Sequence, residues 1–232
     1  MRENRFFGNF DFSKKEIIID DAETCRQLSV VLRVKKGDKI TLCNNNKRCF
    51  GAVIQTIQKR DITCILEEEI KNNELDHTIG LNCAILKKEN FEWVVQKATE
   101  LGVSQITPII TQRTVKLNID KKRLEKITKE AAEQSGHSRI PAVEKTETFK
   151  KALEKKTKNT KILCDMSGVS IKKEDIQGNS ELFIGPEGGW SQEEIEMAKK
   201  EGCLVRSFSS FTLRAETAAI VATYQIVSFT IK

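Results

Sequence analysis

The segment best suited to chemistry is a glycine-rich loop at residues 184–191, Ile-Gly-Pro-Glu-Gly-Gly-Trp-Ser. Its glycines can adopt positive φ angles and let a ligand approach the backbone. The loop leads into a capping-box pattern that begins at Ser191 and predicts a helix N-terminus, where free N–H groups bind anionic or polar ligand atoms. The spacing fits neither G-x-G-x-x-G nor the P-loop, so those nucleotide sites lose their main support. We predict a ligand site, and the alternative is a turn that needs glycine only for steric reasons.

A second candidate segment covers residues 207–219, which run from an expected strand into an expected helix at residues 215–229. Its hydroxyl groups and exposed backbone could hydrogen-bond a nucleobase. Arg214 and Glu216 fall in the first helical turn. A glutamate there interacts favourably with the helix dipole, whereas an arginine is electrostatically disfavoured and needs a partner or a function. A salt bridge is the alternative for Arg214.

Other polar residues follow expected strands or helices. Residues 133–141 end a helix with a polar, basic loop that contains His137, but no partner for a catalytic histidine is evident, so RNA contact or loop capping is favoured. Lys87, Lys88 and Arg113 follow expected strands, where α/β proteins bind ligands, and solvated surface charge is the alternative for each.

Two halves with different periodicity position these segments. Up to about residue 70 the pattern is β-rich, with strands expected at residues 16–20, 37–43, 48–57 and 61–67 and one helix at 22–31. A polar linker at 71–74 follows. Beyond it, strands alternate with helices, which predicts a mostly parallel α/β sheet. The clearest helix, at residues 89–101, has apolar residues at helical spacing and Gly102 in the position of a C-terminal cap.

The composition excludes several classes of protein. Of the 232 residues 39% are hydrophobic and 31% charged, as in globular proteins, and no apolar run approaches the roughly 20 residues of a membrane span. The N-terminus lacks a signal peptide, so we expect a cytoplasmic protein. Seven cysteines without a C-x-x-C pair predict buried, reduced thiols, and two distant histidines make a metal site improbable. The net charge of +6 weakly favours a polyanionic partner.

These segments together resemble one protein family over nearly the whole chain. It is the RsmE family of SPOUT-class RNA methyltransferases, which methylate N3 of a uracil in the 16S rRNA of the small ribosomal subunit. The most specific part of the match is Gly-Pro-Glu-Gly-Gly at 185–189 followed by Leu-Arg-Ala-Glu-Thr-Ala at 213–218. The remaining matched segments are residues 5–7, 31–33, 96–103, 106–108, Arg113, 133–136 and 139–141.

The resemblance implies an architecture that periodicity could not reveal. Residues 1–72 would form a PUA-like β-barrel that binds RNA. Residues 73–232 would form a SPOUT α/β domain whose C-terminal part is threaded into a deep trefoil knot, an exception to the rule against threaded chains. The resemblance also implies S-adenosylmethionine as cofactor, the small ribosomal subunit as partner, and a homodimer with the final helix at its interface. Neither a metal nor a membrane is implied.

The resemblance and the charges assign roles to individual residues. Arg214 would stabilise negative charge on the uracil, and Glu216 would fix Arg214 or assist proton loss. The cofactor would be held by Cys164, Met166, Ile184, Gly185, Pro186, Glu187, Gly188, Gly189, Phe208, Thr212, Leu213, Arg214 and Thr217. RNA would be bound by Arg5, Arg33, Lys88, Arg113, Ser135 and Arg139.

Two departures from the family pattern and two rival functions remain. Trp190 stands where the family often has a smaller apolar residue, and residues 208–211, Phe-Ser-Ser-Phe, replace a run resembling Leu-Gly-x-Arg-Val. One rival is an RNA-binding protein without catalytic activity, and the intact glycine loop argues against it. The other is a SPOUT methyltransferase that acts on another RNA, such as tRNA.

Overall fold

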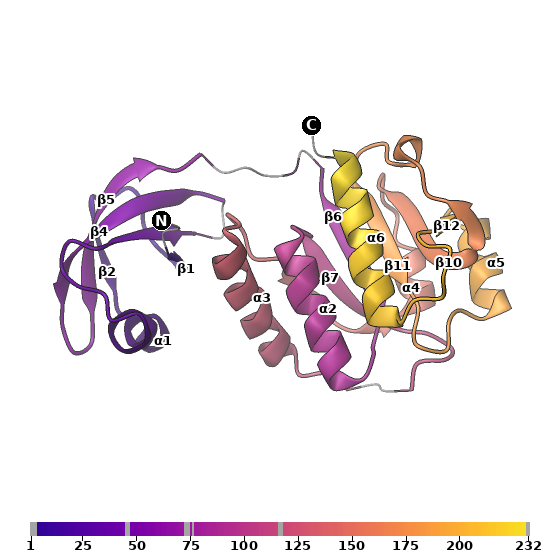
Figure 1. Cartoon of the computed structure of the whole chain (residues 1–232), viewed down its shortest axis with the longest axis horizontal. Helices are drawn as coiled ribbons and strands as arrows, with labels where there is room; N and C mark the ends of the chain where they lie inside the picture. Colours follow the sequence, from indigo (N-terminus) through magenta and orange to yellow (C-terminus); the bar gives the residue numbers. More distant parts are fainter. Residues whose placement is uncertain (1–3, 45–46, 72–74, 76, 116–117, 231–232) are drawn as a thin grey trace. The chain divides into compact units, whose positions relative to one another are not determined.

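The structure is a computed structural model that describes residues 4–44, 47–71, 75, 77–115 and 118–230. The chain divides into two compact units (Figure 1). The first comprises Met1–Glu74 and Ala132–Ile140, and the second comprises Leu75–Ala131 and Pro141–Lys232. The sequence-based boundary between residues 72 and 73 assigned the segment Ala132–Ile140 to the second domain, whereas in the structure this segment packs with the first unit.

The first unit is built on a five-stranded sheet with the order β1-β3-β4-β5-β2. The edge strand β1 runs parallel to β3, and all other neighbours are antiparallel. The strands are β1 (Arg5–Phe7), β2 (Glu16–Ile19), β3 (Lys39–Cys43), β4 (Cys49–Ile57) and β5 (Ile62–Glu69). The β-rich pattern and the meander of β3, β4 and β5 confirm the prediction, while the short strand β1 was not expected.

One helical segment closes the apolar face of this sheet. The prediction of a helix over residues 22–31 is confirmed, although α1 (Ala22–Arg26) continues as a π-helical turn, η1 (Gln27–Val31). Asp21 caps α1 by accepting a hydrogen bond from the Thr24 N–H at 2.8 Å. The core contains alternating strand residues and Leu28 of the π turn, which has no exposed surface.

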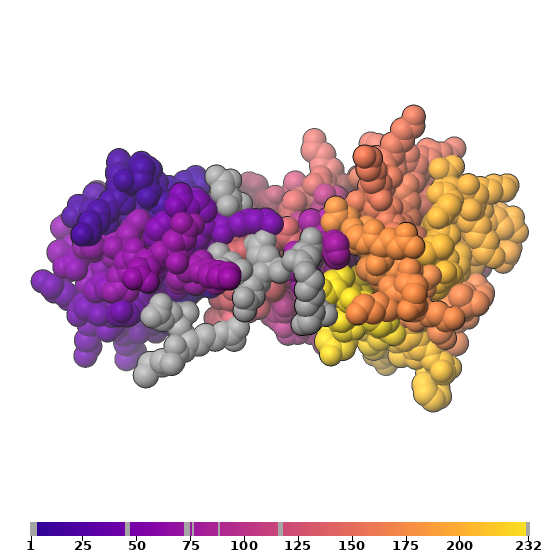
Figure 2. Space-filling model, turned by 90° about the horizontal axis from the view of Figure 1, so that it is seen from above, coloured from indigo at the N-terminus to yellow at the C-terminus, as the bar shows by residue number. Residues whose placement is uncertain are grey.

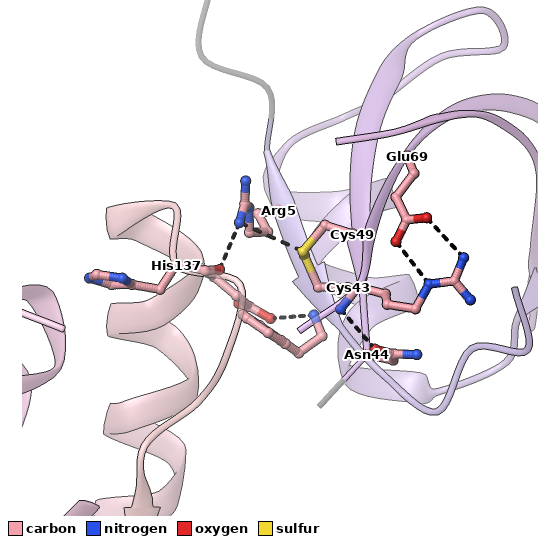
Figure 3. The surroundings of a disulfide bond; sticks show 9 residues. Arg5, Cys43, Asn44, Cys49, Glu69 and His137 are labelled. Carbon is pink, nitrogen blue, oxygen red and sulfur yellow. Dashed lines mark hydrogen bonds and ion pairs between the residues drawn. A yellow bond between two sulfur atoms is a disulfide. The ribbon is translucent and has the colours of Figure 1, made fainter. Parts of the chain in front are cut away.

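A disulfide joins the ends of β3 and β4 (Figure 3). Cys43 and Cys49 lie directly opposite each other in the antiparallel pairing, with their Cα atoms 4.1 Å apart. The prediction of reduced cysteines is therefore wrong for this pair, because the hairpin between the two strands brings the cysteines into register. Cys25, Cys64, Cys83, Cys164 and Cys203 are free thiols.

The second unit is built on a parallel sheet with the order β12-β10-β11-β6-β7-β8, and β9 pairs with β7. All recorded pairings in it are parallel, as the alternation of strands and helices predicts. The strands are β6 (Ile79–Ala84), β7 (Gln105–Ile110), β8 (Ala142–Val143), β9 (Glu147–Thr148), β10 (Thr160–Ser170), β11 (Ser180–Ile184) and β12 (Leu204–Ser207).

Helices cover both faces of this sheet (Figure 1). Along β11, Leu182 and Ile184 belong to one apolar cluster and Phe183 to the other, because successive side chains of a strand point to opposite faces. The first cluster includes residues of α2 (Lys88–Glu100), α3 (Lys121–Ser135) and α6 (Ala215–Thr230). The second includes residues of α4 (Phe149–Leu153) and α5 (Gln192–Lys200). No helix of the described residues is long and apolar enough to cross a membrane.

The helix boundaries confirm the signals found in the sequence. Gly102 follows α2 with a φ of 86°, as a C-terminal cap requires. Asp120 caps α3 by accepting the Arg123 N–H at 3.1 Å. Ser191 and Glu194 form the reciprocal capping box at the start of α5. These caps fix the points where the chain leaves the sheet and enters the loops of the site.

The edge pairing of β10 with β12 is interrupted beside those loops. Arg206 of β12 is the register partner of both Cys164 and Val169, so residues 165–168 are extra residues in β10. Arg206 also forms a bidentate ion pair with Asp175, at 2.8 and 2.6 Å, which holds the pKa of the Asp175 carboxyl below its usual value. The ion pair thus ties the segment that follows β10 back onto β12.

Candidate functional site

A cavity of about 830 Å³ lies at the carboxyl ends of β11 and β12 and beside residues 164–166 of β10. The carboxyl edge of a parallel sheet is where α/β proteins bind ligands. The orange and yellow segments of the second unit that supply most of its walls adjoin one another in Figure 2. The walls include all the residues predicted to bind a cofactor except Thr217, and both Arg214 and Glu216. The sequence therefore predicted most of a real cavity from three separate segments.

The glycine-rich loop forms one wall and is anchored to two other loops and to strand β10. The Gly189 N–H donates to the Pro186 carbonyl at 2.9 Å, and Gly189 has a φ of 69°, so this turn requires a residue that tolerates the left-handed region. The Lys87 N–H, after β6, donates to Glu187 Oε1 at 3.3 Å. The Arg113 guanidinium, after β7, donates to the Gly188 carbonyl at 2.7 Å.

The third anchor is the side chain of Trp190, a residue of the loop itself. Its indole N–H donates to the Cys164 carbonyl at 3.0 Å, linking the loop to β10. The ring is 6% exposed and packs against Phe149. A Cβ atom added at Gly185 would lie 3.0 Å from the indole, so the large ring and the glycine fit each other. Trp190 is therefore a structural part of the cavity floor, which the sequence marked only as a departure from the family.

The opposite wall is the segment between β12 and α6. Ser207 Oγ donates to the Ser209 carbonyl at 2.9 Å, and Ser209 Oγ accepts the Phe211 N–H at 3.0 Å. Thr212 Oγ1 lies 3.2 Å from the sulfur of Met166, which connects this wall to β10. The Phe211 side chain is 78% exposed at the cavity. These contacts show that the Phe-Ser-Ser-Phe segment forms a turn braced by its own side chains.

Arg214 and Glu216 differ in their surroundings. Arg214 is exposed, and its carbonyl accepts the Ala218 N–H at 2.8 Å, so it occupies the N-cap position of α6. Within the described ranges its guanidinium has no carboxylate partner, and the salt bridge that was the alternative for Arg214 is absent. Glu216 is 6% exposed and forms no ion pair with Arg214. A role for Glu216 in fixing Arg214 through an ion pair is thus not supported by the geometry.

The residues predicted to bind RNA fall into two groups. Arg5, Arg33, Ser135 and Arg139 belong to the first unit, whereas Lys88 and Arg113 belong to the second. The structure brings Arg5 to the loop that contains Ser135 and Arg139, because Arg5 Nη1 donates to the His137 carbonyl at 2.8 Å (Figure 3).

The other RNA candidates differ in how they are held. Arg33 is exposed with a φ of 52°. Lys88 opens α2, and its side chain lies outside the described part. The N–H groups of Gly136 and His137 donate to the Ala132 carbonyl, so His137 takes part in ending α3, which agrees with loop capping.

Several residues of the cavity were assigned no individual role from the sequence, although most lie within or beside the candidate segments. They are Lys87, Asp165, Trp190, Ser207, Ser209, Phe211, Ala215 and Ala218. Asn90, in the first turn of α2, also lines the cavity and carried no signal in the sequence. No group of three His, Cys, Asp or Glu side chains suited to a metal ion occurs among the residues described.

Comparison with known proteins decides the family. A model of the RNA methyltransferase domain matches residues 71–227, more than half of the chain, and a model of the RNA methyltransferase PUA domain matches residues 31–67. The chain belongs to this RNA methyltransferase family. The ribosomal RNA small subunit methyltransferase E of Rickettsia conorii is 31% identical over 97% of this chain and 96% of that protein. The protein of the same name from Bacillus subtilis is 29% identical, over 83% and 82%.

A solved structure supports the same assignment. The ribosomal RNA small subunit methyltransferase E of Neisseria gonorrhoeae, bound to S-adenosyl methionine, superimposes on this RNA methyltransferase with a TM-score of 0.88. The alignment covers 98% of each chain at 27% identity. The resemblance inferred from the sequence motifs is thereby confirmed at the level of the family.

Cys164 gives this RNA methyltransferase a thiol in the cavity wall whose reactivity can be predicted. Burial, with a smaller contribution from Asp165, raises the pKa of Cys164 to about 12. Only the thiolate is alkylated, so labelling by iodoacetamide should be slow at pH 7.5 and rise about tenfold per pH unit up to pH 10. Mass mapping of labelled peptides measures this, with Cys164→Ala as control. Fast labelling at pH 7.5 would contradict the buried environment.

Proposed function

We propose that this protein transfers the methyl group of S-adenosylmethionine to N3 of a uracil in 16S rRNA of the small ribosomal subunit. The observation that carries the proposal is the cavity at the carboxyl ends of β11 and β12 and beside residues 164–166 of β10, where the glycine loop and Arg214 line the same space. The fold match to a relative bound to S-adenosyl methionine supports the choice of cofactor. Binding to the ribosome also favours a cytoplasmic location.

The cavity has the chemistry that this cofactor requires. S-adenosylmethionine supplies an electrophilic methyl group on a sulfonium, and its adenosine offers ring edges and hydroxyls for hydrogen bonds. The loop at residues 185–189 presents backbone close to the cavity, and Gly188 and Gly189 leave no side chain in the way. Apolar side chains of Ile184, Phe208 and Leu213 provide surface for the adenine ring. These segments, with the backbone of residues 164–166, would hold the cofactor.

Arg214 would act on the methyl acceptor. Uracil N3 carries a weakly acidic proton, and its loss leaves negative charge on the ring and its oxygens. A cation fixed at the N-cap of α6, exposed at the cavity, is placed to stabilise that charge as it develops. The uracil must be unstacked to reach the cavity. Alignment of its N3 with the methyl group is positioning catalysis and needs no covalent intermediate.

Glu216 is the candidate for assisting loss of the N3 proton. Glu216 lines the same cavity and is mostly buried, and no arginine or lysine among the described residues forms an ion pair with it. We assign proton loss, rather than orientation of Arg214, to Glu216.

The first unit would bind the RNA outside the catalytic cavity. Its match to the PUA domain of RNA methyltransferases supports a PUA-like barrel for residues 1–72, followed by the catalytic domain at residues 73–232. Arg5, Arg33, Ser135 and Arg139 would contact phosphates there, and Lys88 and Arg113 would do so in the second unit. Contacts of this kind make RNA affinity fall with rising salt concentration, which a filter-binding titration can measure.

Two further features of the family complete the proposal. A trefoil knot in the C-terminal part follows from the resemblance to the family, and the match of the RNA methyltransferase model to residues 71–227 supports it. A homodimer through α6 is supported by its apolar sequence and by Tyr224, which is 59% exposed on that helix. Sedimentation of the purified chain as a monomer at micromolar concentration would contradict the dimer.

The function is tested by methyl transfer to defined RNA substrates. Tritium-labelled S-adenosylmethionine is incubated with the protein and with small ribosomal subunits from cells that lack the enzyme, or with tRNA. We expect label in 16S rRNA and none in tRNA. Label in tRNA alone would support a methyltransferase with another target. If the RNA acquired no label and the protein did not bind the cofactor, the result would support an RNA-binding protein without catalytic activity.

A further inference from the structure

We propose that Glu194 is a positioning residue that couples two loops of the cofactor cavity and thereby sets Arg113 against the glycine loop. The proposal rests on the proposed function, because its effect is exerted on S-adenosylmethionine binding. Glu194 does not line the cavity and belongs to no motif that carries the chemistry. Its buried carboxylate is nevertheless shared between two segments that are far apart in the chain.

The contacts of Glu194 exceed those of an ordinary helix cap. The residue is 7% exposed. Its Oε2 accepts the Ser191 N–H at 3.0 Å, and its own N–H donates to Ser191 Oγ at 3.2 Å, which completes the capping box. Its Oε1 accepts the Gln112 N–H at 2.8 Å, across 82 residues of sequence. The capping box accounts for the first oxygen only, so the second bond is a separate link from α5 to the loop after β7.

The loop after β7, which contains Gln112, is a hydrogen-bonded turn. The Thr114 N–H donates to the Thr111 carbonyl at 3.2 Å, and the Thr114 hydroxyl accepts the Thr111 N–H at 2.9 Å. Gln112 and Arg113 are the central residues of this turn. Anchoring the Gln112 peptide therefore also anchors Arg113, which follows it directly.

Arg113 connects this turn to the wall of the cavity. Its Nη1 donates to the Gly188 carbonyl at 2.7 Å. A Cβ atom added at Gly188 would lie 3.4 Å from both Cβ and Cδ of Arg113, so the aliphatic part of the arginine lies against the glycine. Gly188 lines the cavity. A continuous path thus runs from Glu194 through the Gln112 peptide and Arg113 to the backbone of the glycine loop.

The chemistry of the link requires a carboxylate. Both of its partners are backbone N–H donors, and an ionised carboxylate offers only acceptors. A glutamine has the same size but presents one acceptor oxygen and one NH₂ group. The variant Glu194→Gln must therefore leave one of the two N–H groups facing another donor, which costs more than the mere loss of a bond.

The first test compares cofactor affinity of the full chain in calorimetric titrations with S-adenosylmethionine. We expect Glu194→Gln to bind about tenfold more weakly than the unchanged protein. The matched control is Glu196→Gln, which removes the same charge from an exposed position of the same helix and should bind normally. Normal binding by Glu194→Gln would overturn the inference and leave the proposed function intact. Absence of binding by the unchanged protein would overturn both.

A second variant tests the link from its other end without touching Glu194. Gln112 is the second residue of the turn Thr111–Thr114, a position where proline is well tolerated. Gln112→Pro removes the N–H donor together with the glutamine side chain and should weaken cofactor binding to a similar degree, whereas Gln112→Ala, which keeps the N–H, should bind normally. If Gln112→Pro bound S-adenosylmethionine normally, the link through Gln112 would be refuted even if Glu194→Gln failed to fold.

A double-mutant cycle separates positioning from general stabilisation. If Glu194 acts through Arg113, the losses of affinity in Glu194→Gln and Arg113→Ala should be strongly less than additive when combined. If Glu194 merely stabilises α5, the two losses should add, and the proposal would be wrong. Melting temperatures of the same four proteins show whether any change in affinity follows a change in stability.

Discussion

Replacement of Arg214 by alanine should lower the rate of methyl transfer by about 10²–10³-fold while S-adenosylmethionine still binds with nearly unchanged affinity. The reason is the position of the side chain, which is exposed in the cavity wall at the N-cap of α6 and has no carboxylate partner in the described part of the chain. Because the guanidinium forms no salt bridge with a described residue, it can stabilise the negative charge that develops on the uracil.

The measurement combines single-turnover methylation of small subunits with calorimetric binding of the cofactor. Arg214→Lys keeps the charge but not the planar guanidinium, so its rate should lie between those of the other two proteins. Arg123→Ala is a suitable control, because Arg123 is an exposed arginine of α3 that pairs with Glu92 outside the cavity. Full methylation by Arg214→Ala with intact cofactor binding would show that Arg214 has no catalytic role.

Replacement of Gly168 by alanine should destabilise the second unit by about 1–3 kcal/mol or more. A Cβ atom at this position would lie 2.6 Å from the amide nitrogen of Arg206 and from the carbonyl carbon and oxygen of Val205. These are backbone atoms of β12, so they cannot rotate away as a flexible side chain would. The methyl group must therefore force β10 and β12 apart beside Cys164 and Met166, and cofactor binding should weaken as well.

Unfolding of the second unit can be followed selectively. Both tryptophans of the chain, Trp93 and Trp190, belong to it, so fluorescence during heating reports this unit alone. The melting temperature of Gly168→Ala should fall by about 2–4 °C for each kcal/mol lost. The control is Gly80→Ala in β6, where an added Cβ would meet its nearest atom at 3.6 Å, an ordinary contact. An equal, small effect of both substitutions would contradict the close approach of the strands.

The sequence was informative where function and local structure depend on neighbouring residues. The turn at Gly189, the C-terminal cap at Gly102 and the capping box of Ser191 all follow from residue types at fixed spacing, and the structure contains each. The parallel sheet follows from the alternation of strands and helices. The resemblance to the RsmE family implied that the motifs at 184–191 and 207–219 hold one cofactor, and the structure brings both motifs to one cavity.

Features that depend on contacts between distant segments could not be predicted. The strand β1 has only three residues and is held by parallel pairing with β3. The Cys43–Cys49 disulfide depends on hairpin register, which cysteine spacing alone does not specify. Two hydrogen bonds between distant segments could not be predicted either. The Trp190 indole donates to the Cys164 carbonyl, and the Gln112 N–H donates to the Glu194 carboxylate. Residue type suggested neither partner, because each partner is a backbone group.

The segment Ala132–Ile140 shows a further limit of sequence periodicity. Its first residues, up to Ser135, are the end of α3, so nothing in their spacing separates them from the rest of that helix. In the structure the Phe7 N–H donates to Glu133 Oε1 at 3.2 Å, and Arg5 donates to the His137 carbonyl. These hydrogen bonds assign the segment to the first unit. They also bring Arg5 and Arg139 into the same unit as candidates for RNA contact.

The proposed function requires that this cavity direct the methyl group to N3 of a uracil in 16S rRNA. The most direct test is to digest 16S rRNA after reaction with labelled S-adenosylmethionine and to identify the modified nucleoside by chromatography and mass spectrometry. We expect label in 3-methyluridine, and its loss when Arg214 is replaced by alanine. Label in a ribose-methylated nucleoside, or in a base other than uracil, would contradict it.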